Sequence, residues 1–391
     1  MSTLLLLLLS PLAHAQEPYA MNDVGGTLTL PKGWESSEWA DWSLKAKSPD
    51  GVLMRLYLTP FQVEPSADNG RAWSAMYQER LEKEGGGAFK EPAVEVVSLP
   101  LASGPVQGAR VDLDFTFERQ KEAGTLHAAA FPVRGQTLHI ETVSLARNDK
   151  RSREALDTML AGFSLEKGPD PVNTARVESE SGFAFTPPPG WRAPLSKELE
   201  LVRKVSGKVG EETLDPKRCA VVVRPPATGD ADVIFACELY KHLGVVDEYS
   251  FASVEQELHQ EFFGSAAKPV DVATQARFGE RLGFLYAPPV AAHPVRLAIA
   301  PYDKGVVLLW ALSNQVDEAG LDSAVQATLA SFEFTGPDGG APIVALDQRI
   351  GYWLKHRPTS PMVLGPAALI VLAIGGAVAL SRRRKPELDL D

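Results

Sequence analysis

Three residues in the first half of the chain, His127, His139 and Glu141, could bind a metal ion. Two imidazoles and one carboxylate are ligands that Zn²⁺ accepts, provided that all three side chains share one face of the backbone. The sequence shows no fourth ligand. A solvated sheet face without metal is therefore the alternative interpretation.

The segments that carry these residues predict a β-hairpin. Thr125–Phe131 and Thr137–Val143 flank a turn at Pro132–Gln136. If the turn is centred on Arg134, residues whose numbers sum to 268 lie opposite each other, so the first histidine faces the glutamate and the second histidine shares their face. In the second half of the chain the corresponding positions are Leu297, Leu309 and Ala311.

The chain has two cysteines, Cys219 and Cys237. If the turn between them is centred on Pro226–Gly229, they lie directly opposite each other on neighbouring strands, close enough for a disulfide. An exported protein permits this oxidation. Two free buried thiols, or a redox or metal role, are the alternatives.

Other residues that could carry chemistry favour structural roles. Glu255 and His259 are spaced as a surface pair on the predicted helix Val254–Phe263. The three tryptophans of Trp34–Trp42 could form a ligand or carbohydrate platform, but core packing beside the first strand is the favoured interpretation. Because G-x-S-x-G, H-E-x-x-H, C-x-x-C and the phosphate-binding loop are absent, we expect neither an enzyme nor a cofactor.

The first residues resemble a secretory signal peptide. Six leucines, Leu4–Leu9, precede the small-residue site Ala13-His14-Ala15, so we expect residues 1–15 to be removed before Gln16. A short buried helix is the alternative.

The last residues predict a membrane anchor. Pro361–Leu380 has no charged residue, and a helix of that length spans about 30 Å. Arg382–Lys385 follows and should keep the tail, 381–391, in the cytoplasm. We therefore expect the lipid bilayer as a partner and the bulk of the chain in the bacterial periplasm or at the cell surface. A buried helix of a soluble protein is the alternative.

The composition narrows the class of protein. With 45% hydrophobic and 23% charged residues, the chain can build sizeable cores and is not disordered. Its net charge of −11 disfavours a nucleic-acid partner, because binding phosphates needs clustered lysine and arginine.

The region between the two ends contains an internal repeat. Leu28–Trp34 and Phe183–Trp191 both carry proline followed by Gly-Trp. The sequence therefore predicts two similar domains, 17–167 and 177–335, and a juxtamembrane segment, 336–360, that lies against the bilayer or docks onto the second domain.

Within each half, the hydrophobic pattern predicts an α+β fold. Val52–Leu58 and Ala109–Phe117 alternate as half-buried strands do, and Ala72–Lys83 has helical spacing. Each half then closes with a helix, Ser152–Ala161 or Glu318–Leu329, and a short strand. We expect each domain to be an antiparallel sheet flanked by helices, with one C-terminal transmembrane helix after the second.

This order of elements resembles the Mog1/PsbP-like superfamily, including its bacterial DcrB-like envelope members. The matching features are the opening stretch with proline and Gly-Trp, and the closing helix with a small-residue–Phe end, at Gly162-Phe163 and Ser331-Phe332. The resemblance implies an antiparallel sheet flanked by helices, and a binding or assembly role rather than catalysis. It does not extend to the duplication or the transmembrane segment.

Together these features predict a membrane-anchored extracytoplasmic protein whose two domains bind an unknown protein partner or support assembly. The alternative is a metal- or ligand-binding protein that uses the face of His127, His139 and Glu141. Because the second domain has leucines at the corresponding positions, we expect its face to be buried and the polar face of the first domain to stay exposed to water.

Overall fold

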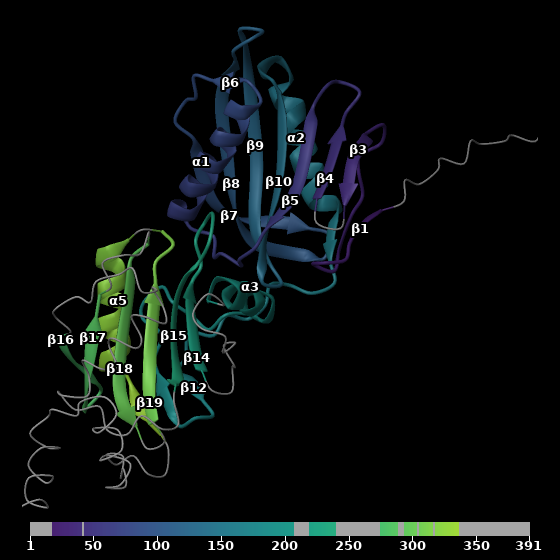
Figure 1. Ribbon diagram of the computed structural model, residues 1–391. Helices are drawn as coiled ribbons and strands as arrows, with labels where there is room; N and C mark the ends of the chain where they lie inside the picture. Colours follow the sequence, from purple (N-terminus) through teal and green to yellow (C-terminus); the bar gives the residue numbers. More distant parts are fainter. Residues whose placement is uncertain are drawn as a thin grey trace, which may run out of the picture. The chain divides into compact units, whose positions relative to one another are not determined.

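The computed structural model describes residues 18–40, 43–206, 219–239, 274–287, 293–302, 305–315 and 317–335 (Figure 1). The chain divides into two compact units. Of the described residues, the first unit comprises those up to Asn173 together with Pro194–Leu201 and Arg224–Ala231, and the second comprises the others. Because two short segments of the second half group with the first unit, the domain limits 17–167 and 177–335 stay predictions.

The first unit contains an eight-stranded antiparallel sheet and a small three-stranded sheet. The large sheet consists of β3 (Glu35–Ala40), β4 (Ser43–Lys47), β5 (Leu53–Thr59), β6 (Gly86–Gly87), β7 (Ala93–Leu101), β8 (Gly104–Phe117), β9 (Glu122–Val133) and β10 (Gln136–Leu145). Its order is β3-β4-β5-β10-β9-β8-β6, and β7 also pairs with β8. The small sheet has the order β1-β2-β11, with bounds Tyr19–Met21, Gly26–Leu28 and Phe163–Leu165.

Two helices of the first unit pack against the large sheet. Helix α1 (Ala67–Lys83) begins earlier than predicted, because the Ser66 hydroxyl accepts a hydrogen bond from the backbone N–H of Asn69 and caps the helix. Helix α2 (Asp149–Gly162) follows the 3₁₀ turn η1 (Ala146–Asn148). The core on the α2 face contains these buried residues: Ala129, Phe131, Leu138, Ile140, Leu156, Met159 and Leu160.

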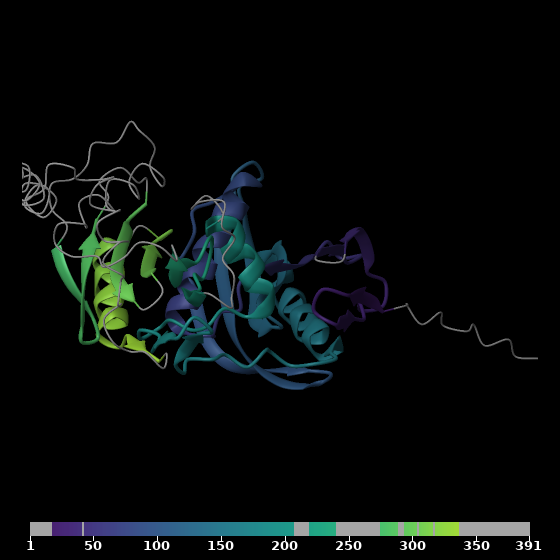
Figure 2. The same cartoon turned by 60° about the horizontal axis from the view of Figure 1, so that its bottom comes forward.

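The second unit contains a six-stranded and a three-stranded antiparallel sheet. Its strands are β12 (Val177–Ser179), β13 (Phe183–Phe185), β14 (Cys219–Arg224), β15 (Asp232–Leu239), β16 (Thr274–Phe278), β17 (Arg281–Tyr286), β18 (Val295–Tyr302), β19 (Gly305–Leu312) and β20 (Glu333–Phe334). Its helix among the described residues is α5 (Glu318–Ala330), and α3 (Ser196–Ser206) begins in the segment that groups with the first unit and ends in the second. Figure 2 shows α5 lying against the six-stranded sheet, where its apolar residues join the core.

Strand order is the same in corresponding parts of the two units. The six-stranded order β14-β15-β19-β18-β17-β16 parallels β4-β5-β10-β9-β8-β7, and β12-β13-β20 parallels β1-β2-β11. A glycine with positive φ, Gly33 (84°) or Gly190 (80°), precedes a tryptophan whose backbone N–H donates to the carbonyl of the proline three residues earlier. Glycine adopts this conformation without steric cost. Both units are therefore α+β and antiparallel, as the sequence predicted.

Several predicted segments lie outside the described residues. These are the signal segment 1–15, the helix Val254–Phe263 with Glu255 and His259, the juxtamembrane segment 336–360, the anchor Pro361–Leu380 and the tail 381–391. None of the helices that the structure describes has the length and apolar character that crossing a membrane requires.

Candidate functional site

The hairpin that carries the three predicted metal ligands has a different register from the predicted one. β9 and β10 join through the two-residue turn Arg134-Gly135, and paired residues have numbers that sum to 269. Both turn residues have positive φ, 33° and 80°, as in type I′ hairpin turns. The prediction centred the turn on Arg134 alone, and this error of one residue reverses the face of every side chain on one strand.

The predicted shared face of His127, His139 and Glu141 is therefore wrong. His127 pairs with the residue after Glu141 and lies on the face that α2 covers. His139 and Glu141 lie on the opposite face, which α1 covers. Among the residues that the structure describes, no three His, Cys, Asp or Glu side chains are grouped so that they could hold a metal ion.

His139 lies in a buried aromatic cluster between β5, β10 and α1. The Tyr57 ring stacks on the imidazole, with ring centroids 5.0 Å apart, and the rings of Trp73 and Tyr77 meet it edge-on. The Nδ1 atom lies 2.9 Å from the Tyr77 hydroxyl, and Nε2 lies 3.1 Å from the hydroxyl of Thr59. Both ring nitrogens therefore have hydrogen-bond partners.

This environment keeps the His139 imidazole neutral. Burial, together with the positive charge of Arg80, lowers the pKa of His139 to about 3. The side chain has no exposed surface, which contradicts the expectation that this face stays wet. A neutral, fully buried imidazole with both nitrogens bonded suits a structural role better than proton transfer to a substrate.

Glu141 lies beside His139 in a charged network that ties the sheet to α1. Its carboxylate pairs with Arg55, at 3.3 Å, and with Arg80. Arg55 also pairs with the partly exposed Glu84, and the Arg80 guanidinium lies 4.6 Å from the ring centroid of Tyr57. Burial raises the pKa of Glu141, and the two guanidinium groups oppose that rise. The network balances two cations against two carboxylates.

On the opposite face, His127 bridges two aspartates. Its Nδ1 lies 2.6 Å from Asp112 on β8, and its Nε2 lies 2.8 Å from Asp149, the first residue of α2. Each ring nitrogen of His127 therefore lies within hydrogen-bond distance of a carboxylate. Burial raises the pKa of Asp112. The contacts of Asp112 with His127 and Arg153 have the larger, opposite effect, so the pKa of Asp112 is lowered overall. The arrangement anchors the start of α2 to the sheet.

An arginine occupies the position of His127 in the second unit. The innermost pairs of the two hairpins are Val133–Gln136 and Tyr302–Gly305, so equivalent residues differ by 169. His127 therefore corresponds to Arg296, which pairs with Glu318 and Asp322 at the start of α5, at 2.8 and 2.6 Å. In each unit a nitrogen-bearing side chain on a central strand ties the sheet to the first turns of the following helix.

The predicted equivalents Leu297, Leu309 and Ala311 are therefore wrong by one residue. His139 and Glu141 correspond instead to Leu308 and Trp310, both buried. Leu297 and Leu309 are buried as expected, but Leu297 pairs with Trp310 whereas Leu309 pairs with Ala298, so the two leucines lie on opposite faces. The second unit thus has apolar residues at the positions of His139 and Glu141.

The correspondence of His127 and Arg296 gives a testable prediction. Replacing His127 with leucine should destabilise the first unit by about 1–2 kcal/mol, because Asp112 and Asp149 lose their shared donor. Replacing it with arginine should cost less, since Arg296 makes the same kind of bridge. Hydrogen exchange of α2 peptides, followed by mass spectrometry, measures both effects. Equal losses of stability for the leucine and arginine variants would contradict the bridging role of His127. Arg296→Leu is the matched change in the second unit.

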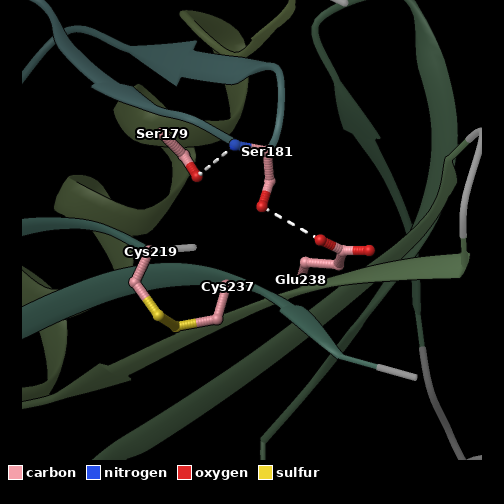
Figure 3. Close-up of a disulfide and its surroundings, with 5 residues drawn as sticks. All are labelled: Ser179, Ser181, Cys219, Cys237 and Glu238. Atoms are coloured by element: carbon pink, nitrogen blue, oxygen red, sulfur yellow. Dashed lines mark hydrogen bonds between the residues drawn. A yellow bond between two sulfur atoms is a disulfide. The ribbon is translucent and has the colours of Figure 1, made fainter. Parts of the chain in front are cut away.

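Cys219 and Cys237 are joined by a disulfide between β14 and β15, the pairing that the sequence predicted (Figure 3). Their Cα atoms are 4.2 Å apart, as in directly opposed residues of an antiparallel pair. Nearby, the Ser181 hydroxyl donates to Glu238 at 3.0 Å, and the backbone N–H of Ser181 donates to the Ser179 hydroxyl at 3.1 Å. The disulfide closes the β14–β15 hairpin on one side of the second unit's sheet.

Sequence reasoning missed the arginines that surround Glu141. Arg55 interrupts the apolar run Val52–Leu58, and Arg80 lies on the same helical stripe as Trp73 and Tyr77. A charged residue in a buried stripe indicates a buried partner, and that signal was available. Of the tryptophan-rich segment, Trp34 is buried in the core, and Trp42 lies outside the described residues.

Comparison with known proteins yields distant structural likeness only. No family model matches the chain, and no curated protein matches its sequence. The solution structure of cyanobacterial PsbP (CyanoP) from Synechocystis sp. PCC 6803 is similar at 8% identity, covering 40% of this chain and 96% of that chain, with a TM-score of 0.28. A crystal structure from Bacteroides thetaiotaomicron VPI-5482 is similar at 13% identity, covering 51% and 64%, with a TM-score of 0.26. At TM-scores this low, the likeness carries no argument about function.

Proposed function

We propose that the chain is a membrane-anchored extracytoplasmic protein whose two α+β units bind a protein partner or support assembly, without catalysis. The Cys219–Cys237 disulfide is the observation that supports an exported location, because disulfides persist in oxidising compartments. The uncharged segment Pro361–Leu380 and the signal-like residues 1–15 agree with that location in sequence.

The polar residues of the first unit favour a binding scaffold over an enzyme. His139 and Glu141 are buried, and hydrogen bonds and ion pairs occupy them within the fold. His127 bridges two aspartates on the other face. The alternative, a metal site made by these three residues, loses its geometric basis because the sheet separates them. The partner we infer is a protein, with the bilayer as the anchor and no nucleic acid.

The predicted location gives the experiment. A C-terminal epitope tag is added to the full chain, and protease is applied to spheroplasts. We expect the two units to be digested while the tag survives on a short membrane-embedded fragment, because Arg382–Lys385 holds the tail inside. Adding detergent before protease is the control and should expose the tag. Intact units beside a digested tag would reverse the orientation, and release of the chain by alkaline carbonate would contradict the anchor.

A further inference from the structure

Strand β7 forms an open outer edge of the eight-stranded sheet. It pairs with β8 without a register shift from Ala93 to Leu101, and β8 is its partner on one side only. Within the described parts of the chain, the backbone of β7 makes no hydrogen bond outside this ladder. The outward N–H and C=O groups can therefore pair with another strand.

This edge carries few of the features that usually protect an edge strand. Folded proteins block such edges with charged side chains, prolines or bulges. β3, at the opposite end of the sheet, has a register shift between Ser36 and Glu38. In β7 the only charged residue is Glu95, and three of its nine residues are valines. Pro100 lacks an N–H and limits the pairing run to 93–99.

An exposed apolar side chain lies on the same strand. Among the residues that the structure describes, the large apolar side chains that are exposed are Val96 and Val172, at 46% and 36%. The faces of β7 are nevertheless packed. A Cβ atom on Gly70 of α1 would lie 2.3 Å from Val94, and Leu99 is fully buried. Packing on its faces thus fixes β7 in the sheet, while the backbone groups of its outer edge can pair with another strand.

We propose that β7 pairs in antiparallel orientation with β7 of a second copy of this chain. In a two-fold-symmetric antiparallel pair, opposed side chains lie on the same face of the sheet, so the central residue lies opposite its own copy. Pairing about Val97 sets Val97 opposite Val97 of the second copy, Val96 opposite Ser98 and Glu95 opposite Leu99, so no like charges meet directly. The two-fold axis makes every other contact twice. The proposal does not depend on the membrane anchor.

Single-cysteine variants test this pairing in native membranes. Both natural cysteines are in the disulfide, so an introduced cysteine supplies a free thiol. Val97→Cys, treated with a mild oxidant, should give a reducible band at twice the mass of the chain. Thr27→Cys is the matched control, because Thr27 is exposed on β2, a strand with partners on both sides. Equal crosslinking of the two variants would overturn the proposal.

A second measurement tests the edge itself in the full chain. Sedimentation equilibrium in density-matched detergent should show a dimer that Val96→Lys converts to a monomer, because a lysine on the edge opposes strand pairing. Val172→Lys makes the same change at the other exposed valine and should leave the dimer intact. Hydrogen exchange of β9 and β10 checks that each variant is folded. A monomeric parent chain would overturn the proposal, as would Val97→Cys crosslinking only to a different protein.

Discussion

Replacing His139 with glutamine should reduce the stability that the first unit loses between pH 6.5 and pH 4. The folded-state pKa of His139 is about 3, below the value of about 6.5 in an unfolded chain. Between these values the unfolded state binds a proton that the folded state excludes, so stability falls as the pH falls. The neutral His139 therefore contributes its full stabilisation of the folded state above about pH 6.5. Between about pH 6.5 and pH 3 this stabilisation is lost, and it amounts to about 4–5 kcal/mol at about 1.4 kcal/mol per pH unit.

Urea unfolding at a series of pH values, read by pulsed hydrogen exchange on peptides of β10, measures this effect. Glutamine keeps a donor and an acceptor for Tyr77 and Thr59 but does not titrate, so the variant should lose less stability between pH 6.5 and pH 4. His293→Gln is the matched control, because His293 is exposed in the second unit. Peptides of β19 report the second unit in the same samples. The raised pKa of Glu141 acts in the opposite direction and is common to both chains. Identical pH profiles for parent and variant would rule out a buried neutral His139.

The strands and helices of both units could be predicted because their periodicity is local. Residues that alternate between core and solvent identify β8, whereas β5 is a strand whose residues are buried or half-buried throughout, and α5 begins at Glu318 as predicted. The disulfide was also within reach, because Cys219 and Cys237 flank a short turn whose midpoint fixes which residues face each other. These features depend on sequence separation alone.

The prediction of a metal site was wrong because the register of a hairpin depends on its turn type. In the β9–β10 hairpin, Arg134 takes a positive φ that residues other than glycine rarely adopt, so the sequence favoured a longer turn. One residue of error placed His127 on the wrong face. The partners Asp112 and Asp149 come from β8 and from the start of α2, and no local pattern links them to His127. Long-range packing decides such contacts.

The buried network of Glu141 should be the most sensitive part of the first unit to a single change. Glu141→Gln removes the one carboxylate that both Arg55 and Arg80 contact, and it leaves Arg80 without an ionic partner among the described residues. Breaking a buried pair by removing one partner costs about 3–5 kcal/mol, because the remaining charge is not compensated. Urea unfolding, read by pulsed exchange on β10 and α1 peptides, measures the loss at pH 7, where His139 stays neutral in parent and variant.

Glu84→Gln is the matched control, because it makes the same change in the same network at a partly exposed side chain. This change should lower the free energy of unfolding by less than about 1 kcal/mol, because exposed ion pairs contribute little to stability. The second unit supplies a further test, since among its described residues Trp310 takes the place of Glu141 and pairs with Phe235 as Glu141 pairs with Arg55. Removing Arg55, Arg80 and Glu141 together, as leucines, should therefore cost less than the single Glu141→Gln change, because no buried charge is left unpaired. If the triple change cost the sum of three separate losses, the network would stabilise the fold by direct attraction, and the uncompensated-charge explanation would be wrong.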